Sequence, residues 1–436
     1  MEAWVVLVVL FVGLFLLLAS GLPVAFALGV LNMVCVLLFF RGGIDALSLV
    51  AYSTYDSVSH FSFIAVPLFV LMGEVMMHSG LAGLAITAVD SFVGRIPGRL
   101  GVVSMLSGAI FGAASGSSMA SVATIGTVLI PEMEKKGYAR WLSTGSVSCA
   151  GALAILIPPS ALMVIFAGIA GLPVGRLLIA GVVPGLLMAF CLAIFIIFVA
   201  VLRPKVAPRE AVTFDLRKAL ASLRHLVPIV GLVVIVIGGI FAGVVTPSEA
   251  AALGAGGAVL LAAIYRRLTL DGVKNALIGT VRVTGMAFFI IASCKGFAHV
   301  LAYTGAGPMI VRSILGLSSN PLIVIALMSA IVFVLGCVMD GVAMMLILVP
   351  IFMPIAEALG MDLTWWGLVV MVSIEIGLLT PPFGLNLFVV KSILKDVARM
   401  EEVYKAIIPF VGVEVFVMAI IIFFPSVATW LPGLMR

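Results

Sequence analysis

Charged side chains are scarce in this chain, and so are the residues that build most soluble enzyme sites. Only 10% of the 436 residues are Asp, Glu, Lys or Arg, whereas 64% are hydrophobic. This composition excludes a soluble globular protein. The chain has four histidines and five cysteines. The cysteines follow no metal-binding or disulfide spacing, so we expect buried free thiols.

Long apolar runs take up most of the chain. A bilayer-spanning helix needs about 20 apolar residues, and runs near this length occur at 3–20, 24–40, 62–77, 177–201, 226–243, 283–302 and 407–424. We therefore expect an all-α polytopic membrane protein in a lipid bilayer. Glu2 stands where a signal peptide would carry basic residues, so the first run should be a retained helix. The net charge of +5 does not indicate nucleic-acid binding, because the basic residues lie mostly between the runs.

Two stretches of the sequence interrupt apolar helices in the same way, 223 residues apart. The first consists of a Gly/Ser-rich segment at 112–118 and a Pro-Pro pair within 157–160. The second consists of a Gly- and Asp-containing segment at 336–341 and a Pro-Pro pair within 380–383. The pattern predicts two repeats, residues 1–202 and 225–436, joined by a basic linker at 203–224. Paired helix breaks of this kind are typical of secondary transporters.

The loops of the two repeats have opposite charge. In the first pair of equivalent loops, 132–140 is basic, whereas 355–363 has no Lys or Arg. The other two pairs differ in the opposite direction: the second-repeat loops 264–282 and 391–405 are more basic than 41–60 and 169–176. Because basic loops stay in the cytoplasm, the repeats should be inverted. This threading places the N-terminus outside, the linker inside and the C-terminus outside. It makes 100–131 and 323–354 re-entrant hairpins that enter from opposite faces and meet near the midplane.

The broken helices have a chemical use. Backbone groups freed at membrane depth cost several kcal/mol each unless something binds them. Proline removes a donor, so carbonyl oxygens one turn earlier become available to a hard cation such as Na⁺. The N-terminal ends of half-helices carry partial positive charge, which suits a carboxylate. The breaks therefore predict combined binding of sodium and an organic anion.

Several polar residues in apolar runs allow more than one interpretation. Asp340 is functional by default, because membrane-buried carboxylates rarely serve packing, but it could also cap the second arm of the second hairpin. Glu375 could be a ligand, a proton site or a partner for backbone amides, and Glu74 is a weaker candidate. Asn386 either bonds across a helix interface or lines the site. The segment from Thr246 to Glu249 predicts a structural capping box.

At these residues the chain resembles the large membrane subunit of the tripartite ATP-independent periplasmic (TRAP) transporters. The resemblance covers nearly the whole length, and its most specific parts are 115–126, 151–160, 339–340 and 377–386. It implies an elevator-type carrier, not an enzyme, in the bacterial inner membrane. The carrier would need no cofactor other than Na⁺ as coupling ion. It would import C4-dicarboxylates, sialic acid or similar carboxylates, with a small four-helix subunit on a separate chain and a periplasmic substrate-binding protein as partners.

The resemblance also implies residue roles, all of them expectations. One sodium site would use Ser115, Ser118, Gly151 and Pro158. The other would use Gly336, Asp340, Thr380 and Pro381. The substrate would lie near Gly116, Ser117, Ser160 and Asn386. Cys337 and Phe383 occupy variable positions of the pattern.

Three other functions compete with this interpretation. A carrier of the same inverted-hairpin superfamily could transport dicarboxylates or other anions without a binding protein. An intramembrane serine protease could use Ser115 as nucleophile, but it needs a histidine base within hydrogen-bond reach. The histidines, at positions 60, 78, 225 and 299, are expected near span ends or in loops. An ion channel would require Asp340 and the Pro-Pro pairs to face a continuous pore.

Overall fold

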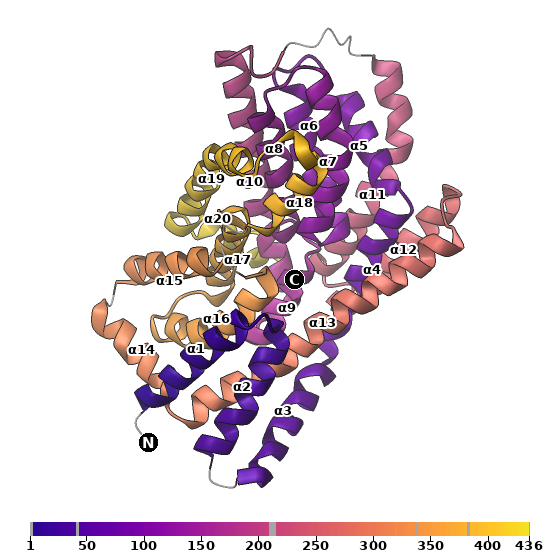
Figure 1. Cartoon of the computed structure of the whole chain (residues 1–436). Helices are drawn as coiled ribbons and strands as arrows, with labels where there is room; N and C mark the ends of the chain where they lie inside the picture. The colour runs from indigo at the N-terminus through magenta and orange to yellow at the C-terminus, as the bar shows by residue number, and fades with distance from the viewer. Residues whose placement is uncertain are drawn as a thin grey trace.

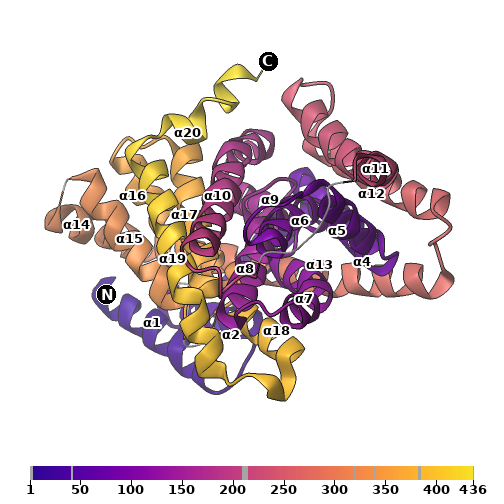
Figure 2. The same cartoon turned by 90° about the horizontal axis from the view of Figure 1, so that it is seen from above.

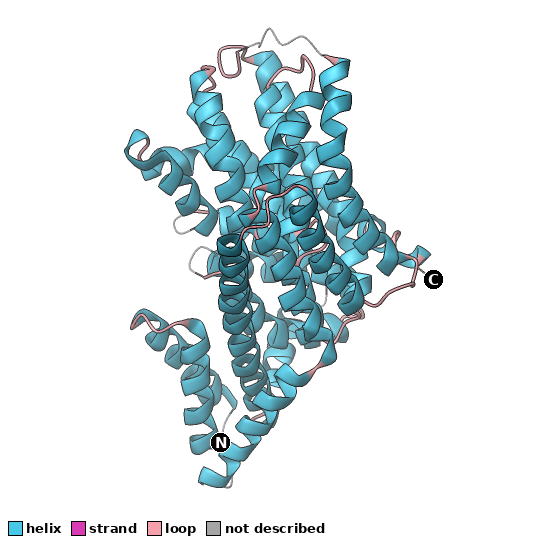
Figure 3. Cartoon of the chain, turned by 90° about the vertical axis from the view of Figure 1, so that its right-hand side faces the viewer, coloured by secondary structure: helices cyan, strands magenta, loops and turns pink. Residues whose placement is uncertain are grey.

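The computed structural model describes residues 3–40, 43–208, 215–318, 320–336, 339–381 and 384–435. Cys337, Pro382 and Phe383 therefore lie outside the described residues, as do Arg41 and Arg209. Within the described ranges the chain forms helices joined by short loops and contains no strand (Figure 3). The expected all-α fold is confirmed.

The helices of the first half are α1 (Ala3–Ala19), α2 (Val24–Phe39), α3 (Leu47–Ser59), α4 (Ala65–His78), α5 (Leu81–Phe92), α6 (Arg99–Ser115), α7 (Ser118–Lys135), α8 (Arg140–Ala152), α9 (Ala161–Ala170) and α10 (Val174–Leu202). Those of the second half are α11 (Leu216–Phe241), α12 (Pro247–Ile264), α13 (Leu270–Tyr303), α14 (Ala306–Leu317), α15 (Pro321–Gly336), α16 (Gly341–Ala358), α17 (Leu363–Leu379), α18 (Leu385–Leu394), α19 (Met400–Phe423) and α20 (Ser426–Thr429). Short 3-10 turns complete the fold, among them η2 (Phe61–Ile64) and η3 (Leu153–Ile155).

The two halves show the same order of elements with one clear difference. A short helix follows each Pro-Pro segment: α9 in the first half and α18 in the second, and a long helix, α10 or α19, comes next. In the first half α3 and α4 are separate helices, whereas the corresponding stretch of the second half is the single helix α13. We expected loops at 41–60 and 264–282, and this was wrong, because α3 and the first part of α13 are helical there. The inverted orientation of the halves stays a prediction.

Local sequence explains where several helices begin. Thr246 and Glu249 form the expected capping box at the start of α12, with Pro247 at the first helical position. Thr269 caps α13 by accepting a hydrogen bond from Gly272 N. Asp362 caps α17 through Oδ1, which accepts from Thr364 N and Trp365 N, both at 2.9 Å.

The helices pack in two groups. The frame helices, α1–α4 and α11–α13, contact one another, with α13 lying against α2, α3 and α4. The core helices, α6–α10 and α15–α19, form a second group in which α8 lies against α6, α7 and α19. Figure 1 shows α13 as one long helix that crosses the molecule obliquely. In Figure 2, α6, α8 and α9 lie in the middle, with α11 and α12 to one side and α1 and α14 to the other.

Glycines allow the core helices to approach closely. A Cβ on Gly108 of α6 would collide with the backbone of Ala150 in α8, and one on Gly151 would collide with Val122 in α7. Gly336 of α15 and Gly377 of α17 touch through their backbones, because a Cβ on Gly336 would lie 2.5 Å from Gly377 Cα. Small residues at such contacts are typical of helix packing in membranes.

Five helices among the described residues are long and apolar enough to cross a membrane: α10, residues 219–241 of α11, α12, α13 and α19. The pair α4 and α5, bent by 71° at its break, would make a sixth crossing. The hairpin arms α6 and α15 are among the shorter apolar helices. Large hydrophobic side chains remain exposed on these helices, as expected where lipid is the solvent; examples are Phe190, Phe198, Val234 and Phe416.

Candidate functional site

The tip of the first hairpin is a sharp reversal between α6 and α7. Gly116 ends α6 with a φ of 60°, a left-handed conformation that favours glycine. Ser117 then caps α7 by accepting a hydrogen bond from Ala120 N at 3.4 Å. The hydroxyls of Ser115 and Ser121 lie 2.8 Å apart. The tip is therefore held by its own serines.

The tip lies against the first break. A Cβ on Gly116 would come within 3.4 Å of Pro159 O and Ala161 N, and one on Gly112 within 3.0 Å of Ala154 Cα. Ser160 is fully buried and caps α9, with its hydroxyl 3.5 Å from Met163 N. The segment 154–161 thus forms one wall behind the tip.

In the second hairpin, an aspartate caps the N-terminus of α16. Asp340 lies directly before α16, and its Oδ1 accepts hydrogen bonds from Val342 N at 3.0 Å and Ala343 N at 3.2 Å. The alternative role of Asp340 as a helix cap is therefore confirmed. In α17, Thr380 donates its hydroxyl to Ile376 O at 2.7 Å, and Gly384 N donates to Thr380 O at 3.2 Å.

The two halves interlock at their breaks. The helix after the first break, α9, packs against α16 of the second hairpin, and the helix after the second break, α18, packs against α7 of the first hairpin. Asn386 of α18 donates its amide to Ser118 Oγ at 2.6 Å, and both side chains are buried. Asn386 was expected either to bond across a helix interface or to line the site, and the bond across the interface is present. Its Oδ1 is buried and bonds to no atom of the described chain.

A cavity of about 340 Å³ lies where these elements meet. Half of the twelve expected site residues line it: Ser115, Gly116, Ser117, Ser118, Asp340 and Asn386. The other six are not among the described residues that line it: Gly151, Pro158, Ser160, Gly336, Thr380 and Pro381. The structure thus brings the two hairpin tips and α18 to one space, and the described residues of the two Pro-Pro segments lie outside its lining.

Four helices begin at this cavity. The first residues of α7, α9, α16 and α18 all line it, namely Ser118, Ala161, Gly341 and Leu385. Helix N-termini carry partial positive charge and unpaired N–H groups. Three of them are capped by Ser117, Ser160 and Asp340, whereas α18 follows Gly384 without a side-chain cap. The convergence of four N-termini favours an anion in the cavity.

Charged side chains complete the lining. Asp340 and Glu74 bring negative charge, and Arg282 of α13 brings positive charge. Glu74 also lies 3.3 Å from His78 Nδ1. The lining therefore offers carboxylate oxygens to a cation, and helix N-termini with a guanidinium to an anion.

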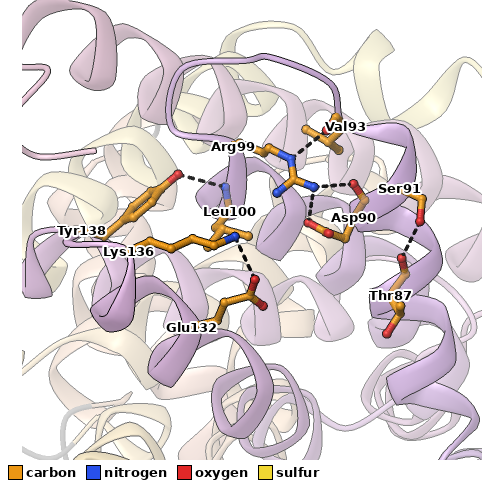
Figure 4. A network of polar contacts seen from close by, with 9 residues as sticks. All are labelled: Thr87, Asp90, Ser91, Val93, Arg99, Leu100, Glu132, Lys136 and Tyr138. Carbon is orange, nitrogen blue, oxygen red and sulfur yellow. Dashed lines mark hydrogen bonds and ion pairs between the residues drawn. The ribbon is translucent and has the colours of Figure 1, made fainter. Parts of the chain in front are cut away.

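The outer end of the first hairpin is fastened by a polar network (Figure 4). Arg99, at the start of α6, is buried and donates to Val93 O and Asp90 O, both at 2.8 Å. It also forms a 2.8 Å ion pair with Asp90 of α5. Tyr138, just after α7, accepts a hydrogen bond from Leu100 N at 3.3 Å. This network holds the two arms together and ties them to α5.

Two carboxyl groups lie apart from the cavity. Glu375 of α17 and Glu414 of α19 are completely buried. Neither oxygen of Glu375 has a hydrogen-bond partner among the described residues, whereas Glu414 lies beside the thiol of Cys149. Glu375 therefore has no backbone amide partner among the described residues, and it does not line the cavity.

Comparison with known proteins assigns the chain to a family. The family model described as "Tripartite ATP-independent periplasmic transporter, DctM component" matches residues 11–427. The chain belongs to the DctM family. The C4-dicarboxylate TRAP transporter large permease protein DctM of Pseudomonas aeruginosa is 36% identical over 408 residues, which cover 93% of this chain and 94% of that protein. The sialic acid TRAP transporter large permease protein SiaM of Vibrio cholerae is 31% identical over 424 residues, covering 96% of each.

A solved structure shares the fold of this DctM-family chain. It is the YdaH transporter of Alcanivorax borkumensis, with a TM-score of 0.63 and 13% sequence identity, covering 94% of this chain and 98% of that one. At this identity the likeness shows the fold alone. The expected membership of the TRAP large-subunit family is confirmed by the family match and the relatives.

Arg282 of this DctM-family chain was not predicted as a site residue. In the sequence it stands among the charges of the expected loop at 264–282, whereas the structure places it within α13 and in the lining of the cavity. The sequence offers one weak signal for it: Arg282 directly precedes the apolar run 283–302, so both can belong to one helix.

Proposed function

We propose that this chain is the large permease subunit of a sodium-coupled importer of an organic acid. The observation that carries the proposal is the cavity on which four helix N-termini converge, with both Asp340 and Arg282 in its lining. A carboxylate substrate would bind the N-termini and Arg282. Na⁺ would bind beside Asp340 and the Ser115–Ser118 tip, and would offset the negative charge that the substrate brings.

We further propose an elevator motion, in which the core helices carry the cavity past the frame helices. The packing supports this, because most helix contacts lie within each group, and the frame meets the core mainly where α4 packs on α6 and α9 and where α13 packs on α16. This motion would open the cavity alternately to the two faces of the bacterial inner membrane. The threading would be the inverted one, with the N-terminus in the periplasm.

The partners would be a periplasmic substrate-binding protein and a small four-helix membrane subunit on a separate chain. A relative named isethionate TRAP transporter permease protein DctMQ, of Oleidesulfovibrio alaskensis, is longer than this chain, which covers 66% of it at 29% identity. The names of the relatives mention C4-dicarboxylate, sialic acid and isethionate. The substrate would accordingly be a carboxylate or sulfonate.

Uptake into proteoliposomes tests the proposal. The chain would be reconstituted with its small subunit, the binding protein added outside, and uptake of labelled succinate, N-acetylneuraminate and isethionate compared with Na⁺ or K⁺ outside. We expect uptake of one of them that requires Na⁺ and the binding protein. Robust uptake by the chain alone would favour the self-sufficient carrier, and uptake indifferent to Na⁺ would refute the coupling.

A further inference from the structure

A second cavity lies along the same three helices as the first. Its volume is also about 340 Å³, and it is lined by the last residues of α9, by residues 349–354 near the end of α16 and by residues 291–302 of α13. The first cavity is lined by the first residues of α9 and α16 and by residues 282–287 of α13. Figure 1 places α9, α13 and α16 near one another, and α16 contacts both of the others. The two cavities therefore lie at opposite ends of one seam between frame and core.

Basic side chains line the second cavity as well. Lys295 and His299, four residues apart on α13, both belong to its lining, which is otherwise mostly apolar. Lys295 is half-buried, and no carboxylate of the described part of the chain forms an ion pair with it. A basic residue inside a membrane-spanning helix is costly, and in transport proteins such residues mark the route of the ligand.

The spacing of the two cavities matches the spacing of the charges. Arg282 and Lys295 are 13 residues apart on one continuous helix, which corresponds to about 20 Å along its axis. On α16, Val342 lines the first cavity and Met353 the second, which corresponds to about 16 Å. A shift of this size is a little over half of the roughly 30 Å hydrocarbon core. It would bring the hairpin tips from Arg282 to Lys295.

We propose that Lys295 and His299, on the α13 side of the second cavity, bind the carboxylate or sulfonate group of the substrate once the hairpin tips have moved along α13. The inference rests on the proposed function, because it assigns Lys295 to the state in which the tips have moved along α13. Arg282 faces the substrate at one end of the motion and Lys295 at the other. In the inverted threading Arg282 lies toward the cytoplasm and Lys295 toward the periplasm, where the substrate arrives.

Substrate protection of single cysteines tests this site. In a variant without native cysteines, Ala298→Cys reports on the second cavity and Met286→Cys on the first. The substrate that shows uptake, with succinate tried first, should slow alkylation by N-ethylmaleimide about tenfold at both positions. Lys295→Met should abolish protection at position 298 and leave it at position 286. Lys274→Met, an exposed lysine of the same helix, should change neither.

The outcomes separate the two proposals. The inference is overturned if protection at position 298 persists in Lys295→Met. It is also overturned if a protein that still transports, and is protected at position 286, shows no protection at position 298. Absence of uptake and of protection at both positions would instead contradict the proposed function. If Lys295→Met does not insert, anionic and cationic methanethiosulfonates are compared at position 298 with Lys295 in place. The rate of reaction with the anionic reagent, divided by the rate with the cationic one, should be about tenfold higher at position 298 than at Leu277→Cys, an exposed α13 position. Equal ratios at the two positions overturn the inference.

Discussion

Asp340 caps α16, and we propose that it also binds Na⁺; two substitutions separate these roles. Its Oδ1 accepts two backbone hydrogen bonds, from Val342 N at 3.0 Å and Ala343 N at 3.2 Å, and its charge lies at the cavity. Replacing an N-cap by alanine costs about 1 kcal/mol, whereas asparagine caps as well as aspartate. Losing the anion at a helix N-terminus costs a further ~0.3–1 kcal/mol. Asp340→Asn should therefore fold nearly as well as the wild type.

Sodium dependence should nevertheless collapse in Asp340→Asn. A bond to a charged group contributes about 1.5–3 kcal/mol, so the half-saturating Na⁺ concentration should rise roughly 10- to 100-fold. Asp340→Ala should show the same loss together with a lower unfolding temperature. The assay is uptake of the labelled substrate into proteoliposomes over a Na⁺ series, with thermal unfolding followed in detergent.

Asp362 is the matched control. It caps α17 with the same pair of contacts, to Thr364 N and Trp365 N at 2.9 Å, but it does not line the cavity, and its Oδ2 lies 3.8 Å from Arg176 Nη2. Asp362→Asn should keep the wild-type response to Na⁺, and Asp362→Ala should lose only stability. If Asp340→Asn retains the wild-type half-saturating Na⁺ concentration, the carboxylate serves only as a helix cap, and its assignment as a sodium ligand is refuted.

Two further predictions concern packing around the site. Gly336→Ala should reduce the uptake rate and the unfolding temperature, because its Cβ would lie 2.5 Å from a backbone atom of α17. Gly412→Ala is the control, because nothing lies within 4 Å of its Cβ. It should be neutral, or stabilising by the ~0.5–1 kcal/mol that alanine gains over glycine in a helix. Equal behaviour of the two variants would contradict the close contact. Ser118→Ala leaves the Asn386 amide without its acceptor, so unfolding in detergent should show a loss of about 1–3 kcal/mol. Combining it with Asn386→Leu should cost less than the sum of the single changes, and strict additivity would argue against the bond.

The sequence predicted the breaks well, because their signals are local. Proline, glycine and serine mark a reversal wherever they interrupt an apolar run, and the tip at Gly116 and Ser117 follows from that. The capping box from Thr246 to Glu249 was predicted for the same reason. The two hairpin segments, expected at 100–131 and 323–354, correspond to α6–α7 and α15–α16 with ends shifted by a few residues.

The parts that were missed depend on contacts between distant residues. Charge in 264–282 suggested a loop, but Arg and Lys are good helix formers, so α13 continues through them and carries Arg282 to the cavity. Hydropathy reports where a helix lies relative to lipid, not where it ends. The position of Ser160 and Thr380 outside the cavity lining could not be predicted either, since their hydroxyls form hydrogen bonds within their own half of the chain.

The interlocking of the halves has a consequence for how this chain can change over generations. Position 118 on α7 and position 386 on α18 share one hydrogen bond across 268 residues of sequence. A substitution at either position leaves a buried polar group behind in the other half, so the second position is under pressure to follow. Among members of the family, exchanges at these two positions should therefore occur together. The two halves of the chain should therefore diverge together rather than independently.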